Sequence, residues 1–332
     1  MPEIEHASNA TGDRPSRLAS ALGGWLASRI EVDGLRVVSI TPVSGGLVND
    51  VRRVDISFRG GEASYLLRWD PVEGPYAPYD VALQFERFVR LRRTDLPVPE
   101  PLWLETDPDI IGRAFWISEF IEAETPGRLL DPDHPRSAER RRAFVDMLAR
   151  IHGADWRGAG MGEVCPVLDP AALRASLVVA ADTIDRLPPE DRALFGAALD
   201  RLKDTAPASY PLTLTHGDCS LSNYMFRGDR VVAVLDWDLV RITDPVLDLG
   251  YYCAISDRFQ MDRPLAVREA MRRKVVDAYA ARTAVRLDTL PFWELHQTMF
   301  AALSWLRPGW GGQPQQGFAA YRARLAELMA TA

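Results

Sequence analysis

The sequence predicts an α+β fold with two lobes, a small antiparallel sheet that includes one helix and a larger, mostly helical lobe. Three observations support this prediction. Short runs of alternating apolar residues, separated by glycines, fill much of the first third of the chain. Apolar residues recur at helical spacing through most of the remainder. Between the two regions, residues 122–135 are rich in Pro, Gly and Asp, which is typical of a linker.

The 332 residues are therefore divided into three segments. Residues 1–15 are polar and are expected to form a flexible N-terminus. Residues 16–121 are expected to form the N-terminal lobe, and residues 122–332 the C-terminal lobe. A chain of this length is long enough for two packed domains.

The N-terminal lobe is expected to begin with a short amphipathic helix, followed by a three-stranded meander, a second helix and two more strands. Val54, Ile56 and Phe58 alternate as in a half-buried strand, and Gly60-Gly61 is typical of a hairpin turn. In chain order the predicted helices and strands are 16–29, 37–40, 51–58, 64–69, 80–93, 102–105 and 114–121.

The C-terminal lobe is expected to be helical except for one pair of strands. The strands are predicted at 223–226 and 231–235, on either side of a Gly228-Asp229 turn. The predicted helices are 140–152, 170–186, 190–205, 244–256, 264–281, 289–306 and 314–330.

Composition excludes several classes of protein. The formal net charge of −7 argues against a nucleic-acid partner, because such proteins usually carry a basic face. No apolar run approaches the roughly 20 residues that cross a membrane, and the N-terminus has no apolar core of a signal peptide. The three cysteines form no C-x-x-C pair and give no support for a zinc site. We therefore expect a cytoplasmic protein without a membrane or nucleic-acid partner.

One segment carries a recognisable chemical pattern. His216, Asp218 and Asn223 have the spacing H-x-D-x-x-x-x-N, which is typical of a kinase catalytic loop. Thirteen residues after Asn223, Asp236 follows an apolar strand. Phosphoryl transfer needs an Asp that accepts or orients the proton of the attacking hydroxyl, and further oxygen ligands that hold magnesium. The joint pattern favours an active site over an ordinary polar turn.

The same residues resemble a known family. HGDCSLSN, the following VLDWD and the later DPVLDLG at 244–250 are similar to motifs of the aminoglycoside phosphotransferase (choline kinase-like) superfamily, over about residues 35–305. The resemblance implies a two-lobed protein-kinase-like fold that uses ATP and Mg²⁺ to phosphorylate a hydroxyl group of a small molecule. It further implies that Asp218 is the catalytic base, that Asn223 and Asp236 bind the metal, and that His216 supports the loop.

The resemblance also implies where ATP binds. Ser44, Gly45 and Gly46 would lie over the phosphates, because glycine lets backbone N–H groups approach where a Cβ would clash. The segment 118–121 would be the hinge, at which adenine meets backbone groups of Glu119 and Ile121.

The phosphate-binding lysine of kinases has no counterpart here, because the first lysine of the chain is Lys203. Arg68 stands at the expected place on the third strand, and Glu86 on the next helix is its expected partner. Either the pocket is built around Arg68 or the enzyme is impaired, because Arg and Lys differ in reach and geometry. Leu67-Arg68, with the upstream G-x-x-N at 46–49, resembles the branch found beside or fused to acyl-CoA dehydrogenases.

Recognition of the acceptor has two opposed interpretations. Carboxylates can form an acidic pocket for a polyamine such as an aminoglycoside; these are Asp238, Asp244, Asp248 and Asp257. Arginines can instead meet an anion such as the phosphates of a coenzyme A thioester; these are Arg258, Arg263, Arg268, Arg272 and Arg273. Asp244 can also be a helix cap and the arginines a solvated face. His296 and Trp305 fit a core helix better than a ligand site.

Two classes of function follow. The first is an active small-molecule kinase, whose acceptor is a metabolic hydroxyacyl thioester or another small alcohol, or else an aminoglycoside. The second is a nucleotide-binding pseudokinase that acts as a scaffold, which the missing lysine suggests. The intact Asp218, Asn223 and Asp236 favour the first class. The sequence gives no indication of oligomeric state or of ATP over GTP.

Overall fold

The computed structural model describes residues 14–43, 50–69, 74, 79–127, 135–308 and 314–331. The chain divides into two compact units. The first consists of Met1–Val72, Pro78–Phe85 and Glu100–Ile121, and the second of Glu73–Ala77, Glu86–Pro99 and Glu122–Ala332. Residues 86–99 therefore group with the second unit.

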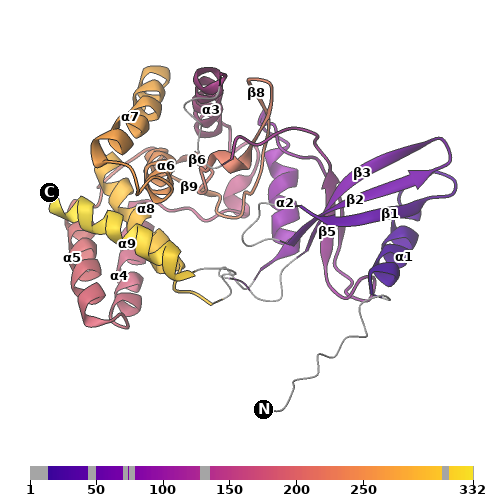
Figure 1. Ribbon diagram of the computed structural model, residues 1–332, viewed down its shortest axis with the longest axis horizontal. Coiled ribbons are helices and arrows are strands. Elements are labelled where there is room, and N and C mark those ends of the chain that lie inside the picture. The colour runs from indigo at the N-terminus through magenta and orange to yellow at the C-terminus, as the bar shows by residue number, and fades with distance from the viewer. Residues whose placement is uncertain are drawn as a thin grey trace, which may run out of the picture. The chain divides into compact units, whose positions relative to one another are not determined.

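The first unit contains a five-stranded antiparallel sheet with the strand order β1-β2-β3-β5-β4 (Figure 1). The predicted three-stranded meander is confirmed. Phe58 pairs with Gly61, so the turn residues are Arg59 and Gly60, not the predicted Gly60-Gly61. Gly60 has a φ of 105°, which glycine adopts without strain. The strands are β1 (Arg36–Pro42), β2 (Asp50–Phe58), β3 (Gly61–Trp69), β4 (Pro101–Glu105) and β5 (Phe115–Glu119).

Alternation along the strands gives the sheet two different faces. Helix α1 (Arg14–Ala27) packs its apolar residues, such as Leu22 and Leu26, into one cluster with Val54 and Leu67. Helix α2 (Val81–Leu91) places Phe85 against Trp116, with the ring centroids 5.9 Å apart. Neighbouring residues of a strand point to opposite faces. Arg68 therefore points away from the α1 cluster, and its guanidinium lies 5.5 Å from the Trp116 ring.

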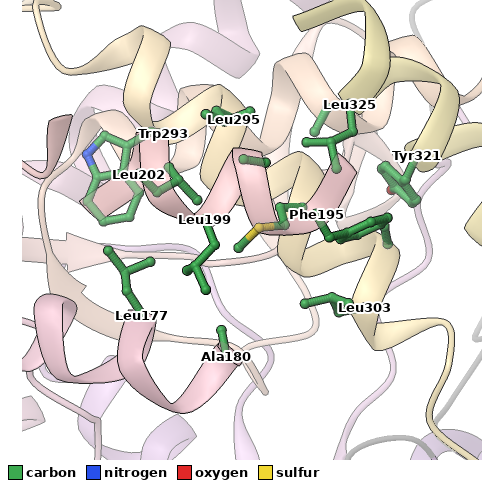
Figure 2. Close-up of a cluster of buried hydrophobic side chains, with 14 of the residues drawn as sticks. Leu177, Ala180, Phe195, Leu199, Leu202, Trp293, Leu295, Leu303, Tyr321 and Leu325 are labelled. Carbon is green, nitrogen blue, oxygen red and sulfur yellow. The ribbon is translucent and has the colours of Figure 1, made fainter. Parts of the chain in front are cut away.

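The second unit is mostly helical, as predicted, and none of the helices in the described part of the chain has the length and apolarity to span a membrane. The helices are α3 (Ser137–His152), α4 (Pro170–Ile184), α5 (Pro189–Thr205), α6 (Val246–Arg258), α7 (Leu265–Arg282), α8 (Leu290–Ser304) and α9 (Pro314–Ala330). The core of this unit contains side chains of α4, α5, α6, α8 and α9 that point toward one another, including Leu177, Phe195, Trp293 and Leu325 (Figure 2).

Two strand pairs interrupt these helices, whereas the sequence predicted one. The predicted hairpin consists of β7 (Tyr224–Arg227) and β8 (Arg230–Val234). The second pair joins β6 (Thr213–Thr215) to β9 (Arg241–Thr243). Strands of three residues are too short for alternation to reveal them. This pair matters for the site, because His216 directly follows β6.

The close approach of α6 to α8 yields a testable prediction. A Cβ added to Gly250 on α6 would lie 2.6 Å from the carbonyl carbon of Trp293 on α8. We expect Gly250→Ala to lower the free energy of unfolding by about 1–3 kcal/mol, the usual cost of overpacking. Urea unfolding followed by circular dichroism measures it.

Gly196 on α5 provides the control, because an added Cβ there has no atom within 4 Å. Gly196→Ala is expected to raise the free energy of unfolding by up to about 1 kcal/mol, since Ala has the higher helix propensity. Equal effects of the two substitutions would contradict the close approach.

Candidate active site

The predicted catalytic loop begins with a fully buried histidine. The ring of His216 packs on Trp237, with the ring centroids 4.7 Å apart. Its Nδ1 accepts a hydrogen bond from the Asp218 amide at 3.2 Å, so the ring proton belongs on Nε2. Nε2 donates to the Leu235 carbonyl oxygen at 2.8 Å. His216 therefore joins the backbone of Asp218 to the residue before Asp236, which is the supporting role that the resemblance implied.

Gly217 occupies a position that no other residue fits. Its φ is 81°, and an added Cβ would overlap the carbonyl oxygen of Leu239. A left-handed conformation against a fixed backbone group requires glycine. The central glycine of the H-G-D pattern thus has a local steric cause.

Asn223 is held in a defined orientation. Its side-chain Nδ2 donates to the Asp218 carbonyl oxygen at 3.0 Å. Its backbone carbonyl oxygen accepts from the Leu235 amide at 2.8 Å. Because the amide nitrogen is used, the side-chain oxygen is the atom that can bind a cation.

Asp236 has the one positive φ, 59°, among the non-glycine residues that the structure describes. This conformation costs on the order of 1–3 kcal/mol and persists only where neighbouring residues hold it. The next residue, Trp237, is 1% exposed, and its Nε1 donates to the Val234 carbonyl oxygen at 3.0 Å. Such an outlier is a reason to consider Asp236 functional.

The structure thus brings together the three residues predicted to form the catalytic centre. Asp236 follows Leu235 in the chain, and Leu235 is hydrogen-bonded to both His216 and Asn223. Asp218 is bonded to the same two residues. One carboxylate oxygen of Asp218, Oδ1, is buried and has no hydrogen-bond partner. An acceptor in this state is suited to take a proton from a substrate hydroxyl.

Oxygen atoms from Asn223 and Asp236 are ligands that suit Mg²⁺. In the described part of the chain no three His, Cys, Asp or Glu side chains are grouped as metal ligands. The chemistry of the candidate pair, one amide and one carboxylate, fits a magnesium ion that is completed by phosphate and water.

Sequence reasoning placed Asp248 in a motif but did not foresee its role. Its carboxylate is fully buried and accepts hydrogen bonds from the amides of His216 and Gly217, both at 2.8 Å. It also pairs with Nε2 of His152 on α3 at 3.0 Å. Burial opposes ionisation, but hydrogen bonding to His152 and Gly217 lowers the pKa of Asp248 below its usual range. His152 had no pattern in the sequence that could reveal it.

On the nucleotide side, Ser44, Gly45 and Gly46 lie outside the described residues. Arg68 on β3 is 8% exposed, and the Glu86 carboxylate accepts a hydrogen bond from Arg90 at 2.7 Å. The pairing of Arg68 with Glu86 stays a prediction.

The predicted hinge begins at the end of β5. The Glu119 amide donates to the Glu100 carbonyl oxygen at 3.0 Å, and the Glu119 carboxylate accepts from the Glu100 amide at 2.9 Å. Ile121 is the last residue of the first unit. The roles of Glu119 and Ile121 toward adenine stay predictions.

The catalytic loop also lies in a part of the chain that is similar to known proteins. The model of the phosphotransferase enzyme family matches residues 39–287, three quarters of the chain, and the match includes the whole catalytic loop. The chain belongs to the phosphotransferase enzyme family. The resemblance inferred from HGDCSLSN and VLDWD is thereby confirmed.

Solved structures show that the fold is kinase-like, as predicted. A candidate aminoglycoside phosphotransferase from Ralstonia eutropha has a TM-score of 0.70 and 22% identity, over 93% of this chain and 96% of that one. Macrolide 2'-phosphotransferase MphH from Brachybacterium faecium has a TM-score of 0.57 and 21% identity, over 93% and 97%. Aminoglycoside phosphotransferase APH(4)-Ia, solved with AMP-PNP and hygromycin B, has a TM-score of 0.65 and 14% identity, over 94% and 98%.

Curated relatives confirm the resemblance to the branch associated with acyl-CoA dehydrogenases. Probable acyl-CoA dehydrogenase IBR3 of Arabidopsis thaliana is 32% identical over 48% of this chain. Acyl-CoA dehydrogenase family member 11 of Gallus gallus is 30% identical over 58% of this chain. The chain spans only 21% and 25% of the lengths of these two relatives.

Three of the four carboxylates proposed for a polyamine, Asp244, Asp248 and Asp257, are buried and paired inside the protein, whereas Asp238 is partly exposed. Asp244 is 2% exposed, and its carboxylate accepts hydrogen bonds from Thr289 at 2.8 Å and from Trp293 Nε1 at 2.7 Å. Its Oδ1 accepts from the Val246 amide, so the alternative of a cap at the start of α6 is supported. Asp248 holds the catalytic loop, as described above.

A third carboxylate of this set, Asp257, is paired with the opposite set. It is fully buried and forms ion pairs with Arg268, at 3.4 Å, and with Arg272. Part of the acidic set and part of the basic set therefore neutralise each other inside the protein, through the pairing of Asp257 with Arg268 and Arg272. Arg263 and Arg273 are exposed and stay available to an anion.

His296 and Trp305 belong to the interior, as the core interpretation predicted. They are 4% and 7% exposed, and the His296 ring stacks on Phe300 with the centroids 4.2 Å apart. Burial, with a contribution from Arg241, lowers the pKa of His296 to about 3.

This burial predicts a pH dependence of stability. Between the ordinary pKa of 6.5 and about 3, the unfolded chain protonates His296 and the folded chain does not, so stability falls as the pH falls through this range. Replacing His296 by Gln removes the titration. We expect His296→Gln to reduce the slope of unfolding free energy against pH by up to about 1.4 kcal/mol per pH unit. Urea unfolding from pH 4.5 to 7 measures both slopes, and equal slopes would contradict the prediction.

Proposed function

We propose that the protein is an ATP- and Mg²⁺-dependent phosphotransferase that phosphorylates a hydroxyl group of a small molecule. The observation that carries this proposal is the hydrogen-bonded network of His216, Asp218 and Asn223 with Leu235, the residue that directly precedes Asp236. The buried, unpartnered Oδ1 of Asp218 supports its role as the base.

In the proposed reaction the acceptor oxygen attacks the γ-phosphorus of ATP, and the bond from this phosphorus to the bridging oxygen of ADP breaks. The proton of the acceptor hydroxyl passes to the Asp218 carboxylate. Asn223 and Asp236 would hold Mg²⁺, which neutralises the charge of the phosphates when it is bound. The chain itself contributes mainly positioning, since the loop backbone is fixed by His216 and Asp248.

Solved structures of similar fold support the binding of a nucleotide. Aminoglycoside phosphotransferase APH(4)-Ia was solved with AMP-PNP, and an aminoglycoside 2'-phosphotransferase was solved with GDP. We propose that Ser44, Gly45, Gly46 and Arg68 meet the phosphates and that the hinge meets the base. The choice of ATP over GTP is part of the proposal.

For the acceptor we propose a hydroxyacyl thioester or a related small alcohol. The matched relatives are acyl-CoA dehydrogenase family members, in which a segment similar to this chain is part of a longer protein. The internal use of Asp244, Asp248 and Asp257 argues against a polycationic acceptor. An aminoglycoside therefore becomes the alternative outcome of the test.

The test follows ADP release from ATP and Mg²⁺ with hydroxyacyl-CoA thioesters, amino alcohols, sugars and aminoglycosides as acceptors. We expect a hydroxyacyl-CoA to stimulate release and Asp218→Asn to lower kcat by about 100-fold or more, as expected for loss of a general base. Stimulation by an aminoglycoside alone would support the resistance alternative. Binding of ATP without release, whatever the acceptor, would support the pseudokinase. Full turnover by Asp218→Asn would refute the assigned base.

A second prediction concerns Arg68. If the pocket is built around its planar fork, Arg68→Lys will weaken ATP binding by about tenfold, because the two cations are not interchangeable at a phosphate. Isothermal titration with AMP-PNP measures it. Arg59→Lys, at an arginine whose side chain is 84% exposed in the β2–β3 turn, is the matched control and should leave the affinity unchanged. Stronger binding or higher activity in the Arg68→Lys variant would show that Arg68 impairs the enzyme.

A further inference from the structure

A buried chain of hydrogen bonds leads from α7 to the catalytic loop. The hydroxyl of Tyr279 on α7 lies 2.6 Å from Nδ1 of His152 on α3. Nε2 of His152 lies 3.0 Å from Oδ2 of Asp248, and Asp248 accepts from the amides of the catalytic loop. Tyr279 and Asp248 are 0% exposed and His152 is 6% exposed. Water is therefore largely excluded from every link.

The direction of these bonds follows from the acceptor at one end. A carboxylate only accepts, so Asp248 requires a proton on Nε2 of His152. In a neutral imidazole the other nitrogen is then an acceptor. The Tyr279 hydroxyl accordingly donates to Nδ1 and stabilises the tautomer that carries its proton toward Asp248.

We propose that Tyr279 is a positioning residue for phosphoryl transfer. Its hydroxyl holds the His152 ring in the orientation in which Nε2 donates to Asp248, and Asp248 in turn holds the backbone of the loop that carries Asp218. The inference deepens the proposed function and rests on it, because the effect on turnover passes through Asp218.

Loss of the hydroxyl would act on the loop through two steps. Without this donor, the buried Nδ1 is left unsatisfied, and the His152 ring loses one of the two bonds that fix its orientation. Nε2 would then be held less firmly against the Asp248 carboxylate, so the partner of the His216 and Gly217 amides would be less fixed.

The packing of α7 does not depend on this hydroxyl alone. Arg282 of α7 forms an ion pair with Asp146 of α3 at 2.9 Å, and Val275 of α7 is 1% exposed. Tyr279→Phe keeps the buried ring and removes one oxygen atom. We therefore expect α7 to remain docked in the variant, so that an effect on the loop can be separated from unfolding.

Tyr210 offers a matched control. Its hydroxyl also makes a hydrogen bond inside the second unit, to the Leu168 carbonyl oxygen at 2.8 Å. Leu168 is bonded to β9, and among the described residues neither Tyr210 nor Leu168 is hydrogen-bonded directly to the catalytic loop. Tyr210→Phe therefore removes a comparable hydroxyl. A general loss of stability would appear in both variants, and a loss of positioning only in Tyr279→Phe.

The experiment combines a spectroscopic and a kinetic readout. The protein has five histidines, so long-range ¹H–¹⁵N spectra of ¹⁵N-histidine-labelled protein can be assigned by single substitutions. We expect His152 to carry its proton on Nε2 in both proteins, and we expect Tyr279→Phe to move the ¹⁵N resonance of His152 Nδ1 toward that of an acceptor without a hydrogen bond. In ADP release, kcat should fall about tenfold while KM for ATP is unchanged, a loss of about 1.4 kcal/mol in the transition state. Tyr210→Phe should match the wild type in both readouts.

A second substitution separates positioning from packing. Gln at position 152 can donate to Asp248 through its amide without help from Tyr279. In a His152→Gln background, Tyr279→Phe should therefore lower kcat no further.

Specific outcomes would overturn the proposal. An unchanged Nδ1 resonance of His152 in Tyr279→Phe, a fall in kcat no larger than in Tyr210→Phe, or an additive fall in the double variant would each contradict it. If the wild type releases no ADP with any acceptor, the proposed function fails, but the Nδ1 measurement still decides whether Tyr279 orients His152.

Discussion

Asp248 accepts hydrogen bonds from the amides of His216 and Gly217 inside a fully buried site, and the shape of the catalytic loop depends on these bonds. A buried carboxylate is costly unless donors surround it, and here two backbone amides and His152 supply them. The same donors explain why the carboxylate stays ionised. Because the amides belong to consecutive residues, one side chain fixes both the direction and the position of the chain that reaches Asp218.

The metal-binding side of the candidate site depends on backbone geometry as well. Leu235 is hydrogen-bonded to His216 and Asn223, and the next residue takes a left-handed conformation. Buried Trp237 holds the chain on the other side of that residue. The energetic cost of the Asp236 conformation is thus offset by packing around it, which is the usual arrangement at functional sites.

A cluster of buried charged side chains in the helical unit is paired internally. Arg324 on α9 forms ion pairs with Asp257 at 2.5 Å, with Glu294 at 2.7 Å and with Glu327 at 2.9 Å. Arg268 and Arg272 join the same cluster from α7. These contacts connect α6, α7, α8 and α9, and removal of one partner would leave a buried charge unpaired. Side chains that look like ligand-binding candidates in the sequence are therefore part of the scaffold that supports the proposed acceptor side.

Features that arise from near neighbours in the chain could be predicted from the sequence. Alternation at Val54, Ile56 and Phe58 and helical spacing after residue 135 indicated the sheet and the helices, because periodicity reflects which face is buried. The spacing of His216, Asp218 and Asn223 indicated the catalytic loop, and the family match agrees with it.

The partners that these elements meet become known only from the folded chain. His152 pairs with Asp248 across 96 residues and with Tyr279 across 127 residues, and no local pattern encodes such separations. The strands of the β6–β9 pair are too short to show an alternating apolar pattern. Asp257 meets its arginines only because α6, α7 and α9 pack together. Burial decides whether a charged side chain binds a ligand or a neighbour, and burial is a property of the folded chain.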